Sequence, residues 1–233
     1  MIREGIKNDA EQIAKLKIRN YQKTYNNIFS NQFLNEMNIE DEKQKYINGL
    51  KNRKVLVYCD EDNVLGYIYY GKRKNHKEVL KHYDGEIYAI YVDVDFQKKG
   101  IGKKLIIAAL NDLINDYNKI ILWCMKDNFD SLQFYEKRNF TKLENIATEI
   151  GGKELFETGL GFNFSKSKNY KLTRYVSFKE KNQVIAVYSN FDLIFLKNET
   201  AIWFKKLVNN EITEDIPISF YKYLIKKEVA EIA

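Results

Sequence analysis

The sequence has few of the features that mark secreted, disulfide-bonded or membrane-spanning proteins. Its 233 residues contain one proline and two cysteines, and no apolar run is long enough to cross a bilayer. The opening residues, "MIREGIKNDAEQ", carry acidic side chains where a signal peptide would be apolar. Cys59 and Cys124 both lie in apolar, strand-like runs, which is typical of buried thiols in a reducing compartment. We therefore expect a cytoplasmic protein with no membrane partner.

What the chain does contain suits a packed core and an anionic ligand. Hydrophobic residues make up 45% of the sequence and aromatic residues 14%, which is ample for a globular protein. The formal net charge of +6 favours anionic ligands without singling out nucleic acid. The small, polar and basic stretch "SKSKNYK" at 165–171 is typical of a linker. The sequence thus predicts two domains, residues 1–165 and residues 166–233.

Two glycines stand where a strand is expected to pass into a helix. The run "GEIYAIYV" at 85–92 is typical of a strand, and the turn "QKKGIG" at 97–102 follows it. In 103–117, apolar residues recur at three- and four-residue spacing and predict one buried helical stripe. The residues of this stripe are Leu105, Ile106, Ala109, Leu113, Ile114 and Tyr117.

The same turn is a candidate anion-binding site. The N-terminus of a helix presents free N–H groups and a partial positive charge. Four lysines add full charges beside it: Lys98, Lys99, Lys103 and Lys104. For an isolated G-x-G, a plain turn with surface lysines is the more common structure, so the wider context decides.

That context resembles one enzyme family. "QKKGIGKKLI" contains neither G-x-G-x-x-G nor G-K-[ST], so it is neither a dinucleotide fingerprint nor a Walker P-loop. It resembles the Q/R-x-x-G-x-G/A signature of the GNAT superfamily of N-acetyltransferases. The segments "GEIYAIYVDVDFQKKGIGKKLI" and "ILWCMKDNFDSLQFYEKRNF" look like that family's core, and "YNNIFSNQFLNEM" and "IGGKELFETGLGF" are also similar to many members. The resemblance covers residues 1–165 and implies an α/β GNAT fold, a mixed and mostly antiparallel sheet flanked by helices.

The resemblance also implies acetyl-CoA as the donor, a primary amine as the acceptor, and no metal. The pyrophosphate of the donor would lie on the turn formed by Gln97, Lys98, Lys99, Gly100, Ile101, Gly102 and Lys103. The main chain of Ile90, Tyr91 and Val92 would pair with the pantetheine arm as an added strand. Asn128 matches the cofactor-side asparagine of the family, and it can equally be the N-cap of the following helix.

Two residues match the family's proton-transfer groups. Tyr135 in "QFYEK" matches the tyrosine assigned as general acid, and its alternative role is a core tyrosine. Glu86 stands 11 residues before Gln97, which is the spacing of the base in the histone-acetylating branch. Desolvation in an apolar strand would suit a base near neutral pH, although a solvent-facing glutamate is equally expected. Trp123 stands where the ribosomal-protein-acetylating branch keeps a glutamate, so that arrangement is excluded.

The family usually has a proline before the signature and a glycine before Phe140. Here "DVDF" lacks the proline, and Asn139 replaces the glycine. Asparagine tolerates the left-handed conformation that ends a helix, so we expect the short helix after Asn128 to end there.

The expected second domain resembles a small winged-helix unit. Residues 176–189 and 192–198 are typical of strands, and residues 199–210 and 217–232 are typical of helices. "LKNETAIWFKKL" resembles the signature of PqqD-like domains, also called RiPP recognition elements. That resemblance implies a peptide that adds as a strand beside the hairpin at 176–189. Ala201, Ile202 and Trp203 are expected in the core rather than in contact with the peptide.

Other roles for this domain stay open. The helix at 199–210 carries only Lys205 and Lys206 as cations and no cluster aimed at base edges, so nucleic acid ranks third as a partner. An extension that forms a homodimer or covers the acetyl site is nearly as well supported as peptide binding.

The sequence as a whole predicts an acetyl-CoA-dependent N-acetyltransferase that acts by direct transfer in a ternary complex. The favoured acceptor is an amine of a peptide or protein recruited by the C-terminal domain. The alternatives are a small amine, such as a polyamine, amino sugar or amino acid, and a non-catalytic CoA-binding regulatory protein.

Overall fold

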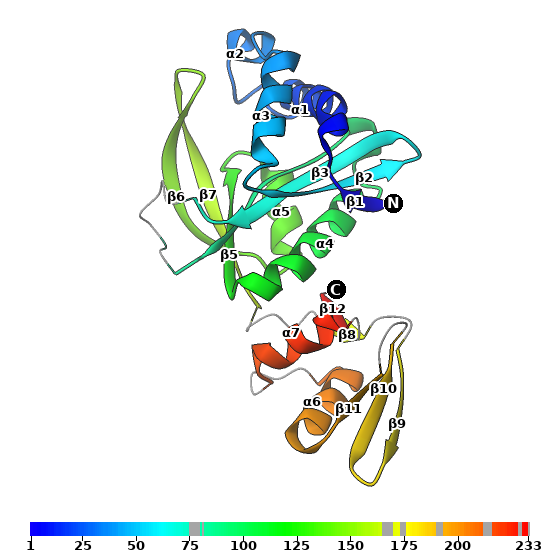
Figure 1. Cartoon of the computed structure of the whole chain (residues 1–233). Coiled ribbons are helices and arrows are strands. Elements are labelled where there is room, and N and C mark those ends of the chain that lie inside the picture. The colour runs from blue at the N-terminus through cyan, green and yellow to red at the C-terminus, as the bar shows by residue number, and fades with distance from the viewer. Residues whose placement is uncertain are drawn as a thin grey trace. The chain divides into compact units, whose positions relative to one another are not determined.

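A computed structural model of the protein describes residues 1–74, 80, 82–164, 170–172, 176–189, 193–211, 216–227 and 230–232 (Figure 1). The chain divides into two compact units. The first comprises Met1–Ala109 and Lys119–Phe162, and the second comprises Leu110–Asn118 and Asn163–Ala233. Most of the linker expected at 165–171 lies outside the described residues, and the domain boundary after residue 165 stays a prediction.

The first unit is built on a seven-stranded sheet. Its strands are β1 (Ile2–Glu4), β2 (Lys54–Asp60), β3 (Asn63–Lys72), β4 (Gly85–Val92), β5 (Lys119–Met125), β6 (Thr141–Ile150) and β7 (Lys153–Asn163). Their spatial order is β1-β2-β3-β4-β5-β7-β6. The pairs β1–β2, β2–β3, β3–β4 and β6–β7 are antiparallel, and β4–β5 is parallel. The expected mixed, mostly antiparallel sheet is therefore confirmed.

Helices cover both faces of this sheet (Figure 1). They are α1 (Ala10–Thr24), α2 (Asn31–Asn35), α3 (Ile39–Gly49), α4 (Ile101–Asp116) and α5 (Phe129–Glu136), with 3-10 turns η1 (Lys7–Asp9) and η2 (Val94–Phe96). Tyr67 of β3 packs in one core with Ile13 of α1 and Tyr46 of α3. The neighbouring Gly66 faces α4, because a Cβ there would lie 3.2 Å from Leu105 Cδ1. Alternation along β3 thus directs the tyrosines toward α1 and α3 and the opposite face toward α4.

The local predictions around α4 and α5 hold. The residues of the expected stripe that lie on α4 are all buried, and Tyr117, which follows the helix, is half-buried. Asn139 follows α5 with a φ of +62°, so it takes the left-handed conformation that its side chain tolerates. The 3-10 turn η2 occupies the place where the family usually has a proline.

Besides the end of α4, the second unit contains five short strands and two helices within its described residues. These are β8 (Tyr170–Leu172), β9 (Ser177–Lys181), β10 (Val184–Tyr188), β11 (Leu193–Leu196), α6 (Asn198–Val208), α7 (Ile218–Lys226) and β12 (Ala230–Ile232). The order β11-β10-β9 forms one antiparallel sheet, and β12 pairs with β8 in another. The expected hairpin at 176–189 and the helix at 199–210 are confirmed, whereas the winged-helix assignment stays a prediction.

Two expectations for this unit are wrong. The closing helix expected at 217–232 ends at Lys226, because Ala230–Ile232 pair as a strand with Tyr170–Leu172. Ile202 was expected in the core, yet it is 56% exposed. The buried face of α6 carries Ala201, Phe204 and Leu207 at three-residue spacing, and position 202 falls outside that face.

Candidate active site

The strands β4 and β5 separate part of the way along their length. Their parallel pairing joins Gly85–Ile87 to Ile120–Leu122 and goes no further. Beyond that point, Ile90, Tyr91 and Val92 pair with β3 alone. The other edge of β4 is therefore open to an extended ligand, which can hydrogen bond to an unpaired strand edge. These are the main-chain positions that the sequence proposed for the pantetheine arm.

The turn after β4 leaves a space in front of exposed backbone. Gly100 has a φ of +85°, and a Cβ built there would meet no atom within 4 Å. The helix α4 makes its first backbone bond from Lys104 N to Gly100 O, at 3.0 Å. The N–H groups of residues 101–103 precede that bond and have no acceptor in the described part of the chain. The turn thus has the open space and free donors that an anion needs.

Packing and hydrogen bonds fix the position of this turn. Gly102 lies against α5, since a Cβ there would be 3.3 Å from Phe134 Cζ. The side chain of Gln97 donates from Nε2 to Val92 O and to Asn20 Oδ1, both at 3.2 Å. Gln97 therefore ties the turn to the end of β4 and to α1, and the side chains of Lys98, Lys99 and Lys103 are exposed around it.

Asn128 joins α5 to α1. Its Oδ1 accepts from Ser131 N at 3.2 Å, so it is the N-cap of α5, as the sequence allowed. Its Nδ2 donates to Tyr25 Oη at 3.4 Å. The sequence assigned no role to Tyr25, although this residue begins the family-like segment "YNNIFSNQFLNEM". The cofactor-side role of Asn128 stays a prediction.

Tyr135 lies in the same neighbourhood with a hydroxyl that keeps its proton. The residue is 8% exposed, and within the described residues its hydroxyl has no hydrogen-bond partner. Burial, with smaller effects from Cys124 and Tyr25, raises the pKa of Tyr135 well above 10. Burial also raises the pKa of the Cys124 thiol to about 12. Tyr25, Cys124, Asn128 and Tyr135 thus form a cluster of neutral groups beside the end of β5.

Glu86 lies apart from this cluster. It is 6% exposed, so the solvent-facing alternative is wrong. Its Oε2 accepts from Lys74 N at 3.1 Å, and its position in β4 is opposite Ile121 of β5. No hydrogen bond joins Glu86 to Tyr135 or Asn128. Tyr135 and Asn128 thus share Tyr25 as a neighbour, whereas Glu86 lies near the start of β4.

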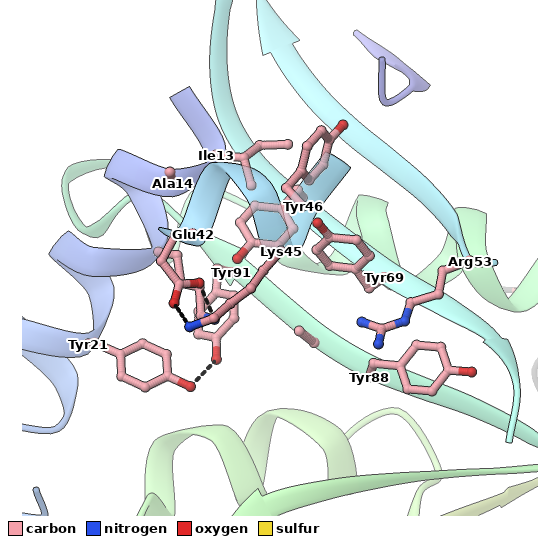
Figure 2. A pocket seen from close by; sticks show the side chains of 13 residues that line it. Ile13, Ala14, Tyr21, Glu42, Lys45, Tyr46, Arg53, Tyr69, Tyr88 and Tyr91 are labelled. Carbon is pink, nitrogen blue, oxygen red and sulfur yellow. Dashed lines mark hydrogen bonds and ion pairs between the residues drawn. The ribbon is translucent and has the colours of Figure 1, made fainter. Parts of the chain in front are cut away.

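A cavity of about 200 Å³ lies between α1, α3, β3 and β4 (Figure 2). Six tyrosines line it: Tyr21, Tyr46, Tyr67, Tyr69, Tyr88 and Tyr91. Tyr91 Oη donates to Tyr21 Oη at 3.4 Å, and the ring of Tyr21 lies 5.2 Å from that of Tyr25. Aromatic side chains thus connect the cavity to Tyr25 and Asn128. The sequence did not predict this cavity, because its walls come from four separate segments.

The described residues offer no obvious metal site, since no three His, Cys, Asp or Glu side chains are grouped to hold an ion. Over the same residues, no helix is both long and apolar enough to span a membrane.

Comparisons with known proteins identify the family. The model of the acetyltransferase (GNAT) family matches residues 18–140, slightly more than half of the chain. The chain is 26% identical over 162 residues to the uncharacterized N-acetyltransferase YuaI of Bacillus subtilis (strain 168), and the match covers 69% of this chain and 91% of the relative.

Two solved structures show the same fold. The PaiA N-acetyltransferase from Thermoplasma acidophilum, in complex with coenzyme A, has a TM-score of 0.56 at 17% identity, covering 70% of this chain and 98% of that one. The yncA protein of Salmonella typhimurium, solved with its cofactor acetyl-CoA, has a TM-score of 0.53 at 18% identity, covering 72% and 95%. Because the family model covers more than half of the sequence, the chain belongs to the acetyltransferase (GNAT) family.

Proposed function

We propose that this protein is an acetyl-CoA-dependent N-acetyltransferase whose acceptor is a primary amine. The observation that carries the proposal is the open edge of β4 at Ile90–Val92, which leads directly to the open turn at Gln97–Gly102. An extended chain ending in a phosphate matches such a strand edge followed by a helix N-terminus. The complexes of two family members with coenzyme A and acetyl-CoA support the same choice of ligand.

The residues of the turn and of β4 have distinct roles in this proposal. The free N–H groups of residues 101–103, with the space before Gly100, hold the pyrophosphate. The exposed side chains of Lys98, Lys99 and Lys103 add positive charge around it. The main chain of Ile90–Val92 holds the pantetheine arm, and Asn128 lies at the next strand end. When bound, acetyl-CoA supplies the acyl group as a thioester.

Tyr135 is the proposed general acid. The proton stays on Tyr135 Oη at neutral pH because burial keeps the pKa of this phenol well above 10. Its hydroxyl has no competing partner in the described part of the chain, so it is free to donate toward a leaving sulfur atom. Transfer is direct, from donor to amine in a ternary complex.

Glu86 is the proposed base, and it acts through water. The amide of Lys74 holds its carboxylate in place, and no hydrogen bond joins it to the cluster at Tyr135. In this proposal the proton leaves the amine and reaches the carboxylate of Glu86 through water molecules. Bulk water is the alternative acceptor of the proton.

Release of the CoA thiol tests the proposal. Full-length protein is mixed with acetyl-CoA and a panel of primary amines, and the free thiol is followed over time. We expect amine-dependent thiol release, and the acetylated amine as the second product in equal amount. Binding of acetyl-CoA without transfer to any amine would favour the non-catalytic, regulatory alternative.

A second candidate acceptor is a peptide recruited by the second unit. The observation that favours it is β9, an edge strand of its sheet whose residues are all exposed. Phe178 on β9 and Phe195 on β11 are exposed apolar side chains, at 42% and 61%. Phe178→Asp should lower the rate on a peptide acceptor and leave the rate on a small amine unchanged. Equal rates on both acceptors in the wild type and the variant would remove the second unit from acceptor choice.

A further inference from the structure

Arg53 lines the tyrosine-rich cavity, and none of the described carboxylates forms an ion pair with it. It precedes β2 and is half-buried, and its guanidinium carbon lies 4.9 Å from the ring centroid of Tyr88 and 6.0 Å from that of Tyr69. Figure 2 shows the guanidinium between these two rings. In the described part of the chain, no carboxylate or hydrogen-bond acceptor pairs with Arg53. Partly buried charges are normally paired, so this guanidinium is available to a ligand.

A second cation lies beside the same ring. Lys74 Nζ lies 5.3 Å from the centroid of Tyr88. Desolvation and the charge of Arg53 lower the pKa of Lys74, and Glu86 opposes that shift. Two cations near one aromatic ring repel each other, and an anion bound between them would relieve the repulsion.

The rest of the cavity does not neutralise this charge. The only acidic residue in its lining is Glu42. The carboxylate of Glu42 forms ion pairs with Lys17 Nζ at 2.6 Å and with Lys45 Nζ at 2.7 Å. Burial raises the pKa of Glu42, but hydrogen bonds from the two lysines outweigh it, so the pKa lies below its usual value and Glu42 is ionised. The lining therefore has three cations, Lys17, Lys45 and Arg53, against one carboxylate. Such a site disfavours a polyamine, which carries only positive charge.

The two sides of the cavity differ in what lies beside them. Figure 2 shows Arg53 and Tyr21 on opposite sides of it. On the Tyr21 side, Tyr91 belongs to the open part of β4, and Tyr25 follows with Asn128. A small molecule whose anion lies at Arg53 would thus direct its other end toward the gap beside β4. The volume of about 200 Å³ suits a small metabolite rather than a drug-sized ligand.

We propose that this cavity binds the acceptor, a small primary amine that also carries a carboxylate or phosphate, and that Arg53 with Lys74 recognises the anionic group. The role of the bound amine as acetyl acceptor rests on the proposed acetyltransferase function, whereas its binding to the cavity does not. Arg53 presents a planar fork of N–H donors, which fits two oxygens of either group.

Matched ligands test the inference on the full-length protein. γ-Aminobutyrate, β-alanine and phosphoethanolamine carry an amine and an anion, and butylamine carries the amine alone. Binding is measured by calorimetric titration without acetyl-CoA, and transfer is measured by thiol release with it. We expect at least one anionic amine to bind and react about 10–100-fold better than butylamine, the range of one charged hydrogen-bonded contact. The carboxylates and the phosphate are compared directly to show which anion the site prefers.

Variants of Arg53 assign the effect to one residue. Arg53→Met should weaken binding and raise KM for the anionic amine about 10–100-fold with little change in kcat. Arg53→Lys keeps the charge, loses the fork, and should fall between. Lys51→Met removes an exposed charge two residues away and serves as the control, which should match the wild type. Thermal unfolding of each variant shows that it is folded.

The outcomes separate this inference from the proposed function. Equal use of butylamine and the anionic amines, with Arg53→Met unchanged, would overturn the inference and leave the acetyltransferase intact. Equal losses in Arg53→Met and Lys51→Met would also overturn it, because bulk charge would then be the cause. Arg53-dependent binding of an anionic amine without acetyl transfer would support the anion site and contradict the proposed function.

Discussion

Asn128 Nδ2 donates to Tyr25 Oη across 3.4 Å, and the two residues lie 103 positions apart in the chain. The contact joins the N-terminus of α5 to the end of α1. Asn128 thereby does two things at once, because its Oδ1 also caps α5. One small side chain thus couples the local order of a helix to the cluster that contains the proposed acid.

Substitutions of Asn128 separate these two roles. Asn128→Ala loses both, and should lower the free energy of unfolding by about 1 kcal/mol, as expected for a lost N-cap. Asn128→Asp retains the cap acceptor but loses the donor to Tyr25, so its stability should stay near wild type while kcat/KM falls. Asn38→Ala, which removes the exposed N-cap of α3, is the control. It should lower stability without lowering kcat/KM, and a matching kinetic loss there would refute a specific role for Asn128.

Tyr135→Phe removes the proposed proton donor and keeps the ring. We expect kcat to fall by about 10²–10⁴, the usual contribution of a general acid, with acetyl-CoA affinity unchanged. Because burial keeps the pKa of Tyr135 well above 10, the rate of the wild type should not fall through ionisation of this tyrosine between pH 6 and pH 9. Tyr223→Phe, at an exposed position, is the control. An unchanged kcat in Tyr135→Phe would remove this residue from the mechanism.

Glu86→Gln tests the proposed base. The amide side chain retains an oxygen that can accept from Lys74 N, so the fold of β4 should be kept. We expect the acidic limb of the pH–rate profile to shift or disappear, since that limb reports the ionisation of the base. If the limb is the same in the variant, water or another group takes the proton.

The pair Arg3–Asp9 predicts how stability depends on pH. Arg3 donates to both carboxylate oxygens of Asp9 at 2.7 Å, and Ile6 N donates at 2.8 Å. Burial raises the pKa of Asp9, but these bonds outweigh it and hold the pKa below its usual value. A lowered pKa stabilises the fold above the usual carboxyl pKa of about 4, and this stabilisation is lost as the pH falls further.

Asp9→Asn should therefore lower the free energy of unfolding at pH 7 by about 3 kcal/mol. It should also flatten the decline in stability below about pH 4. Urea unfolding at a series of pH values measures both effects, and Asp62→Asn, an exposed position, is the control. A decline with pH that is as steep in Asp9→Asn as in the wild type would assign the acid sensitivity to other carboxyl groups.

Local patterns in the sequence predicted the elements that carry the proposed donor site. The three- and four-residue spacing of apolar residues on α4, the glycine turn and the left-handed Asn139 all depend on neighbours in the chain, and the structure has each of them. The closing helix was predicted too long because β12 is held by its distant partner β8. Ile202 was misplaced because the composition of a helix does not show which face packs.

The tyrosine-lined cavity could not be predicted for the same reason. Tyr21, Glu42, Arg53 and Tyr88 come from α1, α3, the loop before β2, and β4. Nothing in their spacing along the chain indicates that they meet. Among 17 tyrosines, six line one cavity only because the fold brings these segments together.

The most direct test of the central claim is a calorimetric titration with acetyl-CoA of the wild type and of two glycine variants. Gly100 and Gly152 both have a positive φ, +85° and +71°, and a Cβ at either would meet no atom within 4 Å. Gly100→Val and Gly152→Val should therefore be strained to a similar degree, but only the first fills the space at the turn before α4. We predict micromolar binding by the wild type and by Gly152→Val, none by Gly100→Val, and none of NADH or ATP by any of the three. Binding of acetyl-CoA by Gly100→Val with wild-type affinity, or no binding by the wild type, would contradict the proposal that this turn holds the donor.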